Sequence, residues 1–309
     1  MKIGYLIDCY KDPIVTKRLI LRLAEDPDNE IFVHVDSKAD MEPFLVQTGR
    51  YNNIHYQKNR RRVYWGGLSQ VLLCIDMLQE ATKYGCERHV TLHNGCWPLW
   101  SNERLRAFFS EDRERIPVVN VSTSPMKTFY KRTWCYHMFE GVDRTRAYLP
   151  RTILARTVSV WNRLGIKYRR GYYRTESGER VDIYFSSGHF CITDKARDHL
   201  LDLVQREPAI LKYFLHCYVP EELFFGTMVR HYAEHSSNRI NGAEILDNTQ
   251  PHSLSSLSET TFFTYLPGRI AEYADPEQEE ALRAQGKPFF RKVTDDSMAL
   301  IDRLEATVI

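Results

Sequence analysis

Short apolar runs alternate with segments of helical periodicity through the first half of the chain. The runs predict strands at residues 3–7, 31–35, 54–56, 88–93 and 117–121. Between them, residues 13–24 and the segment that follows Gly66-Gly67 place apolar side chains on one helical face. Strands that alternate with helices predict an α/β fold with a mainly parallel sheet and helices on both faces.

The second half of the chain predicts a strand pair within 182–192 and helices at 194–205, 221–232 and 295–304. No internal repeat, low-complexity tract or flexible linker interrupts the pattern. We therefore expect a single domain over residues 1–309, with an elaborated second half.

Polar residues end several of the expected strands. Asp8 follows the first strand, Asp36 follows the second, and the segment 94–98 follows the fourth. Because ligands of open parallel sheets bind beyond the carboxyl ends of the strands, we expect the functional site at this edge.

Several familiar site motifs are missing from the sequence. It contains no glycine-rich dinucleotide or P-loop signature and no Cys/His cluster with zinc spacing. Asp26-Pro27-Asp28 has the acid-x-acid form that holds a divalent metal in many sugar-nucleotide enzymes. It precedes a strand, however, and its proline suits a helix-to-strand turn, so we favour the turn and expect no metal site there.

The net charge is close to zero. The 309 residues include 42 Lys and Arg and 40 Asp and Glu, a formal charge of +2. This balance excludes a dedicated nucleic-acid-binding protein. It hides a local excess, because residues 144–180 contain ten basic and two acidic residues and hence a charge of +8. The first part of this segment is amphipathic, which fits either peripheral docking on an anionic membrane or lipid carrier, or a solvated helix whose apolar face packs in the core.

The cysteines and the N-terminus bear on the compartment. Seven cysteines, an odd number without a C-x-x-C pair, predict scattered reduced thiols. The first apolar run is too short for a signal peptide, and no run is long enough to span a membrane. We therefore expect a cytoplasmic protein, with peripheral contact to the inner face of the membrane through the basic segment.

Charged residues beside aromatic ones mark three candidate site segments. In Pro220-Glu221-Glu222-Leu223-Phe224-Phe225, either glutamate suits a helix N-terminus electrostatically, and one can serve as a general base if it is partly buried. In Phe289-Phe290-Arg291-Lys292, the lysine can neutralise a phosphate. Arg60-Arg61-Arg62 is a third basic group. Taken alone, each segment is more simply explained by helix stabilisation or by solvated charge.

Taken in order, these segments resemble the core-2/I-branching glycosyltransferase family, which includes the peptide O-xylosyltransferases. The matching segments run from the first strand almost to the end of the chain. They are Lys11-Asp12-Pro13, Phe32-Val33-His34-Val35-Asp36-Ser37-Lys38, Val63-Tyr64-Trp65-Gly66-Gly67-Leu68-Ser69, Ser187-Gly188-His189-Phe190-Cys191-Ile192-Thr193, Pro220-Glu221-Glu222-Leu223-Phe224-Phe225-Gly226-Thr227, Pro251-His252-Ser253-Leu254 and Phe289-Phe290-Arg291-Lys292-Val293. The Trp-Gly-Gly-x-Ser signature is the most specific of them.

The resemblance implies a GT-A-like fold, with a nucleotide-binding half at 1–125 and an acceptor-binding half at 126–309 that carries a basic insertion at about 141–181. It implies inverting transfer of a sugar, N-acetylglucosamine in the first instance, from a UDP-sugar to a glycan or lipid-linked glycan, without a metal or other cofactor. Glu222 then corresponds to the catalytic base. The donor-binding residues are Asp36, Lys292 and Arg239, and the acceptor-binding residues are Arg132, Trp134, Ser187 and Glu221.

The sequence also departs from the family pattern. Cys96 stands where the family has an aspartate, and Tyr10 where many members have a histidine. We expect Cys96 to line the pocket or, slightly more simply, to pack in the core. Two alternatives stay open: a peptide O-xylosyltransferase that uses UDP-xylose, and a catalytically inactive glycan-binding member of the same fold.

Overall fold

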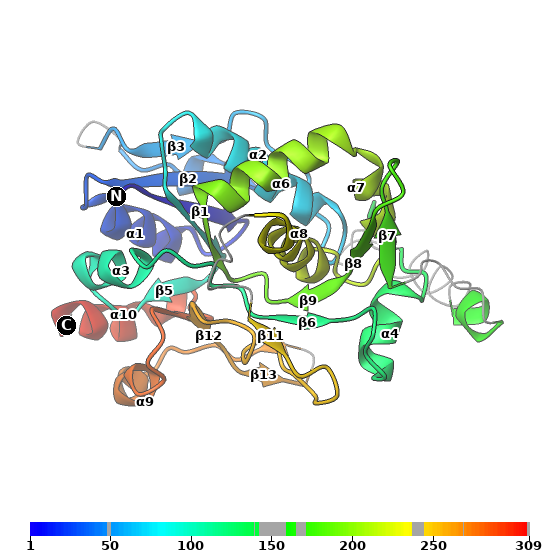
Figure 1. The fold of residues 1–309 in the computed structure, drawn as a ribbon. Coiled ribbons are helices and arrows are strands. Elements are labelled where there is room, and N and C mark those ends of the chain that lie inside the picture. Colours follow the sequence, from blue (N-terminus) through cyan, green and yellow to red (C-terminus); the bar gives the residue numbers. More distant parts are fainter. Residues whose placement is uncertain are drawn as a thin grey trace.

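A five-stranded sheet forms the centre of the computed structural model, which describes residues 1–47, 51–138, 140–141, 159–164, 171–236, 244–267 and 269–307 (Figure 1). Its strand order is β10-β4-β1-β2-β3. The four strands that run parallel are β1 (Ile3–Cys9), β2 (Asn29–Val35), β3 (Ile54–Tyr56) and β4 (Arg88–His93). Only β10 (Cys191–Thr193) is antiparallel to its neighbour β4. The predicted α/β class and mainly parallel sheet are confirmed.

Helices cover both faces of this sheet (Figure 1). The first face carries α1 (Pro13–Ala24), α3 (Asn102–Phe109) and α10 (Met298–Ala306), and the second carries α2 (Ser69–Thr82), α6 (Asp194–Arg206) and α8 (Glu221–His235). Successive side chains of β1 point to opposite faces of the sheet. Tyr5 and Ile7 pack in the hydrophobic core on the first face, and Leu6 packs in the core on the second. The apolar runs within β1 and β2 do not alternate with polar residues because both faces of these central strands are buried.

Two strand predictions need correction in their pairing. β6 (Val118–Asn120) forms as expected, but it lies in a separate sheet of order β11-β6-β9 and not in the central one. The expected strand pair within 182–192 consists of β9 (Tyr184–Ser186) and β10, which do not pair with each other. A loop over Ser187, Gly188 and His189 carries the chain from one sheet to the other. Residue pattern alone does not reveal which partner a short strand will find.

The rest of the described chain consists of short elements. The strands are β5 (Cys96–Pro98), β12 (Thr261–Phe262) and β15 (Phe289–Arg291) in one sheet, β11 (Ile245–Leu246), and the hairpins β7 (Tyr172–Arg174)–β8 (Arg180–Asp182) and β13 (Tyr265–Leu266)–β14 (Arg269–Ile270). The helices are α4 (Lys127–Thr133), α7 (Ala209–Phe214) and α9 (Glu279–Arg283), with 3₁₀ turns at Glu42–Phe44, Pro276–Gln278 and Asp295–Ser297.

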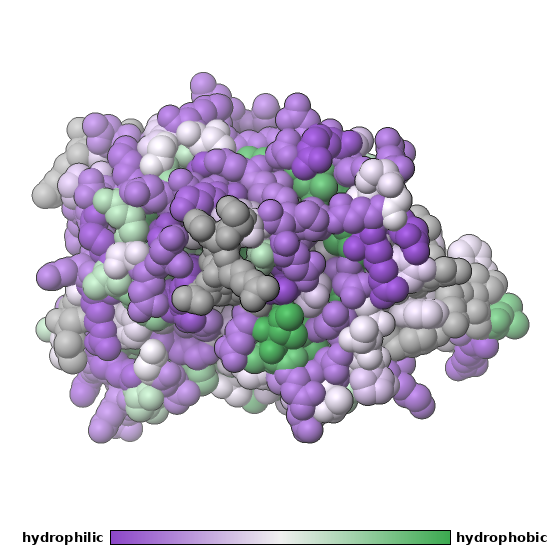
Figure 2. All heavy atoms as spheres, in the orientation of Figure 1, coloured by the Kyte–Doolittle hydropathy of each residue, from purple (hydrophilic) through white to green (hydrophobic). Residues whose placement is uncertain are grey.

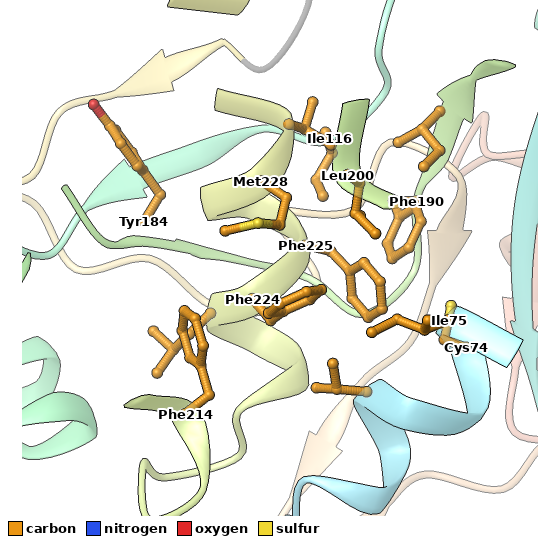
Figure 3. Close-up of a cluster of buried hydrophobic side chains, with 14 of the residues drawn as sticks. Cys74, Ile75, Ile116, Tyr184, Phe190, Leu200, Phe214, Phe224, Phe225 and Met228 are labelled. Atoms are coloured by element: carbon orange, nitrogen blue, oxygen red, sulfur yellow. The ribbon is translucent and has the colours of Figure 1, made fainter. Parts of the chain in front are cut away.

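Helix α8 is anchored by aromatic packing. Phe224, Phe225 and Met228 are fully buried, and Figure 3 shows them among side chains from α2, α6, α7 and the segment before β10. Gly226 is needed where the helix crosses β9, because a Cβ there would lie 2.7 Å from Ser186 Oγ. Each buried Phe contributes about 1.5–3 kcal/mol of burial free energy, so packing holds the N-terminal turns of α8 in a fixed position.

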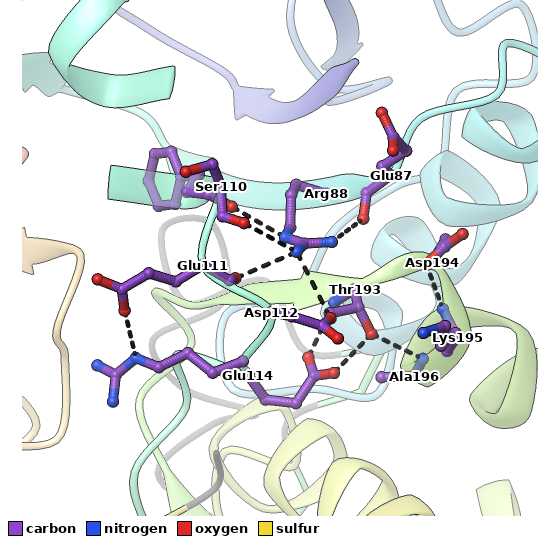
Figure 4. A network of polar contacts seen from close by, with 12 residues as sticks. Glu87, Arg88, Ser110, Glu111, Asp112, Glu114, Thr193, Asp194, Lys195 and Ala196 are labelled. Atoms are coloured by element: carbon purple, nitrogen blue, oxygen red, sulfur yellow. Dashed lines mark hydrogen bonds and ion pairs between the residues drawn. The ribbon is translucent and has the colours of Figure 1, made fainter. Parts of the chain in front are cut away.

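A buried polar network holds β10 and α6 at the edge of β4 (Figure 4). The Glu114 carboxylate accepts hydrogen bonds from Thr193 N at 2.8 Å and from Thr193 Oγ1 at 2.6 Å, and Thr193 in turn caps α6. Arg88 donates to the carbonyl oxygens of Phe109 and Glu111. Burial raises the pKa of Glu114 to about 7, although the bonds from Thr193 oppose the rise.

Most of the basic segment lies outside the described residues. Of its ten cations, Arg163, Arg174 and Arg180 are described, and residues 159–163 are helical. Trp161 and Leu164 are exposed there, at 42% and 70%, so this part of the apolar face is not packed in the core. The molecular face shown in Figure 2 is otherwise mostly hydrophilic. Among the helices of the described residues, none is long and apolar enough to cross a membrane.

Candidate active site

Glu221 and Glu222 lie side by side in the first turn of α8, after Pro220. Both were predicted from the helix-start pattern, and both point into a group of charged side chains. The side chain of Glu221 is 10% exposed and that of Glu222 is 13% exposed. Their partners differ, and this difference separates their chemical roles.

Glu222 pairs with Arg132 of α4. A guanidinium nitrogen of Arg132 donates to Glu222 Oε2, and the same guanidinium lies 4.0 Å from the centre of the Phe185 ring. Burial raises the pKa of Glu222, whereas the Arg132 charge opposes this rise. Within the described part of the chain, Oε1 of Glu222 makes no hydrogen bond. The carboxylate is therefore held at one oxygen and available at the other, as a general base requires.

Glu221 belongs to a chain of charges with His93 and Asp8. His93 Nδ1 lies 2.5 Å from Asp8 Oδ1, and His93 Nε2 lies 3.2 Å from Glu221 Oε1. Asp8 and His93 face each other in the parallel register of β1 and β4, at the carboxyl ends of both strands. Burial acts to lower the pKa of His93, but the Asp8 and Glu221 carboxylates raise it well above its usual value. His93 is therefore a buried imidazolium, and Glu221 is its ion-pair partner.

Close backbone approach makes this contact possible. A Cβ at Gly188 would lie 3.1 Å from the Glu221 carboxylate carbon and 3.2 Å from His93 Nε2. The β9–β10 loop thus passes directly over the pair. Its next residue, His189, has its ring 4.6 Å from that of His93, and its Nε2 accepts from the Arg291 guanidinium at 3.0 Å. Burial, His93 and Arg291 lower the pKa of His189, which stays neutral.

Lys292 and Lys11 form a pair of cations at the same edge. The two side chains are close enough to affect each other's charge, because burial and Lys11 together lower the pKa of Lys292. Lys292 Nζ also lies 3.2 Å from Glu272 Oε1. Two ammonium groups held against each other form a site for a multiply charged anion, because the anion relieves their repulsion.

Asn94 and Gly95 position the two lysines. Asn94 Oδ1 accepts from Tyr10 N and Lys11 N at 3.1 and 3.2 Å, and its carbonyl accepts from Arg291. Gly95 has φ +81°, and a Cβ there would lie 2.8 Å from Lys292 Cγ. The segment 94–98, which the sequence placed at the functional edge, thus joins the Lys11 loop to the C-terminal strand β15.

The other predicted site residues are placed as follows. Asp36 is buried at the end of β2, and Oδ1 of its carboxylate accepts from Lys38 N at 2.9 Å. Ser187 is fully buried and accepts from His189 N, so it supports the loop over the site. Trp134 is half-buried after α4. Arg239 lies outside the described residues.

The remaining candidates of the sequence have structural contacts. Arg106 bridges Asp26 and Asp28, at the amino end of the sheet, which confirms the turn and removes this pair from the functional edge. Arg60 donates to backbone carbonyls and Arg61 pairs with Asp76. Cys96 is buried in the core, and all seven cysteines are free thiols, as expected.

Sequence reasoning flagged Asp8 by its strand end but missed the roles of His93, Lys11, His189 and Arg291. His93 is the last residue of its strand, so the rule that drew attention to Asp8 applies to it equally. Lys11 was noted only as part of the Lys11-Asp12-Pro13 segment, and its pairing with Lys292 could not be predicted because the two residues are 281 positions apart in the chain. Tyr265 was also missed: its ring is half exposed, and Glu222 contributes, after burial, to raising its pKa to about 12.

Comparisons with known proteins identify the family through a family model and a distant curated relative. The model of the family described as Core-2/I-Branching enzyme matches residues 3–169. The curated protein "Xylosyltransferase oxt" of Drosophila pseudoobscura pseudoobscura is 21% identical over 234 residues, which are 74% of this chain and 24% of that protein. The chain therefore spans about a quarter of the relative's length. A solved structure, mannose-1-phosphate geranyltransferase from Thermus thermophilus, is 14% identical over 77% of this chain and 66% of that chain, with a TM-score of 0.29. A TM-score this low supports no conclusion about the fold, so the fold class rests on the family match and on the observed sheet topology.

Proposed function

Because the chain belongs to the core-2/I-branching enzyme family of glycosyltransferases, we propose that it transfers a sugar from a UDP-sugar to a hydroxyl of a glycan acceptor, with inversion and without a catalytic metal. The observation that carries the proposal is the arrangement around Glu222: one partly buried carboxylate, held by Arg132, at the edge of the sheet that also bears the Lys11–Lys292 pair. N-acetylglucosamine is the proposed sugar.

An inverting transfer needs one base on the face of the sugar opposite the leaving group. Glu222 takes the proton of the acceptor hydroxyl while the oxygen attacks the anomeric carbon and the bond to the UDP phosphate breaks. The transition state has oxocarbenium character, by analogy with glycoside hydrolysis. Glu221 does not compete for this role, because it is paired with the His93 imidazolium.

The leaving UDP gains negative charge, which preorganised cations stabilise. Lys292 was predicted for this role, and Lys11 is the described residue best placed to assist it. We therefore propose Lys11 as the second diphosphate contact in addition to Arg239, which the structure does not describe. Asp36 is proposed on the uridine side, and Arg132 and Trp134 on the acceptor side, together with the exposed ring of Tyr265. Ser187 and Glu221 are proposed to act on the acceptor side indirectly, through the β9–β10 loop that Ser187 supports and the His93 pair that Glu221 makes.

The catalytic assignment is tested by comparing Glu222→Gln with Glu221→Gln. Loss of a general base lowers kcat by about 10²–10⁴-fold, and we expect this for Glu222→Gln with UDP affinity near that of the wild type. The melting temperature should also fall, because the substitution removes the charged partner of Arg132, so kcat is compared well below the unfolding temperature. Glu221→Gln should mainly lower the melting temperature, because it removes a charged partner of buried His93. Near-normal transfer by a folded Glu222→Gln protein would refute the base assignment.

The identity of the donor sugar is a second question that experiment must decide. UDP-xylose is the alternative to UDP-N-acetylglucosamine, because one relative is named as a xylosyltransferase. Donor hydrolysis and transfer with UDP-N-acetylglucosamine and UDP-xylose separate the two, and NMR of the first-formed product anomer tests inversion. UDP binding without turnover of either donor would favour the inactive glycan-binding alternative.

Acceptor location is a further part of the proposal. The charge of +8 over residues 144–180 supports docking beside an anionic membrane that presents a lipid-linked glycan. Sedimentation with anionic vesicles and with neutral vesicles tests this contact. We expect binding to the anionic vesicles only, lost at high salt; equal binding to both would contradict the electrostatic reasoning.

A further inference from the structure

A group of histidines lies at the end of α8 opposite to Glu221 and Glu222. His231 and His235 are one helical turn apart on the same face of α8. Their rings stack with centroids 4.0 Å apart. Glu222 and His235 are separated by 13 residues of helix, which is about 20 Å at 1.5 Å per residue, so this group is distinct from the transferase site.

A carboxylate from another part of the chain completes the group. Glu179 immediately precedes β8 in the β7–β8 hairpin, and Oε1 of its carboxylate lies 3.2 Å from His231 Nε2 and 2.8 Å from His235 Nε2. The three ligand atoms all lie within 4.8 Å of one another. Ligand atoms around a tetrahedral zinc ion, with bonds of about 2.0–2.1 Å, are roughly 3.3 Å apart, so small side-chain rotations suffice.

The hydrogen bonds behind the rings favour metal binding. His235 Nδ1 donates to the carbonyl of His231 at 2.8 Å, which in a neutral ring leaves the Nε2 lone pair facing the Glu179 carboxylate. His231 Nδ1 lies 2.7 Å from Nε2 of His199 on α6. Metal-bound histidines are normally held in this way, with the second ring nitrogen bonded to a carbonyl or another outer partner.

Without a cation, two acceptors would face each other between His235 and Glu179, so a proton or a metal ion must lie between them. His231 is buried, and its ring lies between the rings of His199 and His235, 5.0 Å and 4.0 Å away between centroids. Neutral imidazoles and one carboxylate are the ligands that zinc prefers.

We propose that Glu179, His231 and His235 bind Zn²⁺ through the two Nε2 atoms and one carboxylate oxygen, with water in the fourth position and His199 as an outer partner. The ion joins the β7–β8 hairpin to the C-terminal end of α8, two elements that lie side by side in Figure 1. Glu179 is presented by a closed turn, in which Thr175 N donates to the Glu179 carbonyl at 3.0 Å. The ion therefore stabilises the hairpin at the C-terminal end of the basic segment, and it takes no part in sugar transfer.

Zinc titration of the full-length protein without a polyhistidine tag, after removal of metals by a chelator, tests the site. Calorimetry should give one zinc equivalent. Glu179→Gln and His235→Gln, both at side chains at least 40% exposed, should keep the fold and weaken binding by at least about 100-fold. His199→Gln should weaken it less, by about 10–100-fold, as expected for an outer partner.

Two controls address other sources of zinc binding. His252→Gln changes a half-buried histidine whose hydrogen bond is to the Asp247 carbonyl and not to the group, and Cys135→Ser removes the half-buried thiol; both variants should bind zinc as the wild type does. Zinc should also slow amide exchange across residues 172–182 in the wild type but not in Glu179→Gln. Unchanged affinity in Glu179→Gln and His235→Gln, or zinc binding without added protection of the hairpin, would overturn the proposal.

Discussion

Replacing Lys11 by Gln tests whether a second lysine contributes to donor binding. The substitution removes one of two adjacent cations and keeps a polar side chain of similar length. Lys11 lies in the loop after β1, where its main-chain N–H donates to Asn94 Oδ1 at 3.2 Å, and Gln leaves that bond intact. The change therefore acts on charge more than on the shape of the loop.

The expected loss follows from the contacts of Lys11. A hydrogen bond to a charged group contributes about 1.5–3 kcal/mol, which corresponds to roughly 10- to 150-fold in affinity. Two features reduce this: the Lys11 side chain is 38% exposed, and it lies 3.5 Å from Asp12 in the free protein. Removal of Lys11 also removes its repulsion of Lys292, because Lys11 helps to lower the pKa of Lys292. We therefore expect UDP affinity to fall by about tenfold, at the lower end of the range.

Calorimetric titration with UDP and with uridine isolates the diphosphate contribution. UDP binding should weaken in Lys11→Gln, whereas uridine binding should not change. Lys195→Gln, at an exposed lysine on α6, is the matched control for loss of one positive charge. Unchanged UDP affinity in Lys11→Gln, or an equal loss for uridine and UDP, would refute a contact between Lys11 and the diphosphate.

Three further predictions follow from single contacts. Gly95→Ala should lower the free energy of unfolding by at least about 1–2 kcal/mol, because the backbone φ of Gly95 is +81°. It should also weaken UDP binding, because the new Cβ would lie 2.8 Å from Lys292 Cγ. Thermal unfolding and calorimetry measure the two effects, and full UDP affinity would contradict the second. Burial of Glu114 raises its pKa from 4.5 to about 7, so between these pH values the folded state binds a proton that the unfolded state does not. The free energy of unfolding should therefore fall as pH rises through 7, by up to about 3 kcal/mol. Glu114→Gln should flatten the dependence of the melting temperature on pH between pH 5 and 8, and an unaltered slope would refute the link. Transfer activity should survive prolonged EDTA treatment below the unfolding temperature, whereas loss that manganese restores would show a catalytic metal.

The central sheet and the position of Glu221 and Glu222 at the start of α8 were predictable because their signals are local. Strands β1, β2 and β4 are almost wholly buried, and β1 and β2 each contain a short apolar run. Helix α8 follows a proline and starts with two acids and then aromatics. The pairing of β6, β9 and β10 was not predictable, because strands of three residues carry too little pattern to select a partner.

The sequence by itself determined the fold class, the edge of the sheet that bears the site, and Glu222 and Lys292 as its candidates, since residue order and local pattern encode these. Only the tertiary structure decided which charges meet. It placed His93 between Asp8 and Glu221, brought Lys11 to Lys292, and set Glu179 against His231 and His235. Such contacts join residues tens to hundreds of positions apart, and their energies depend on distance and burial, which exist only after the chain has folded.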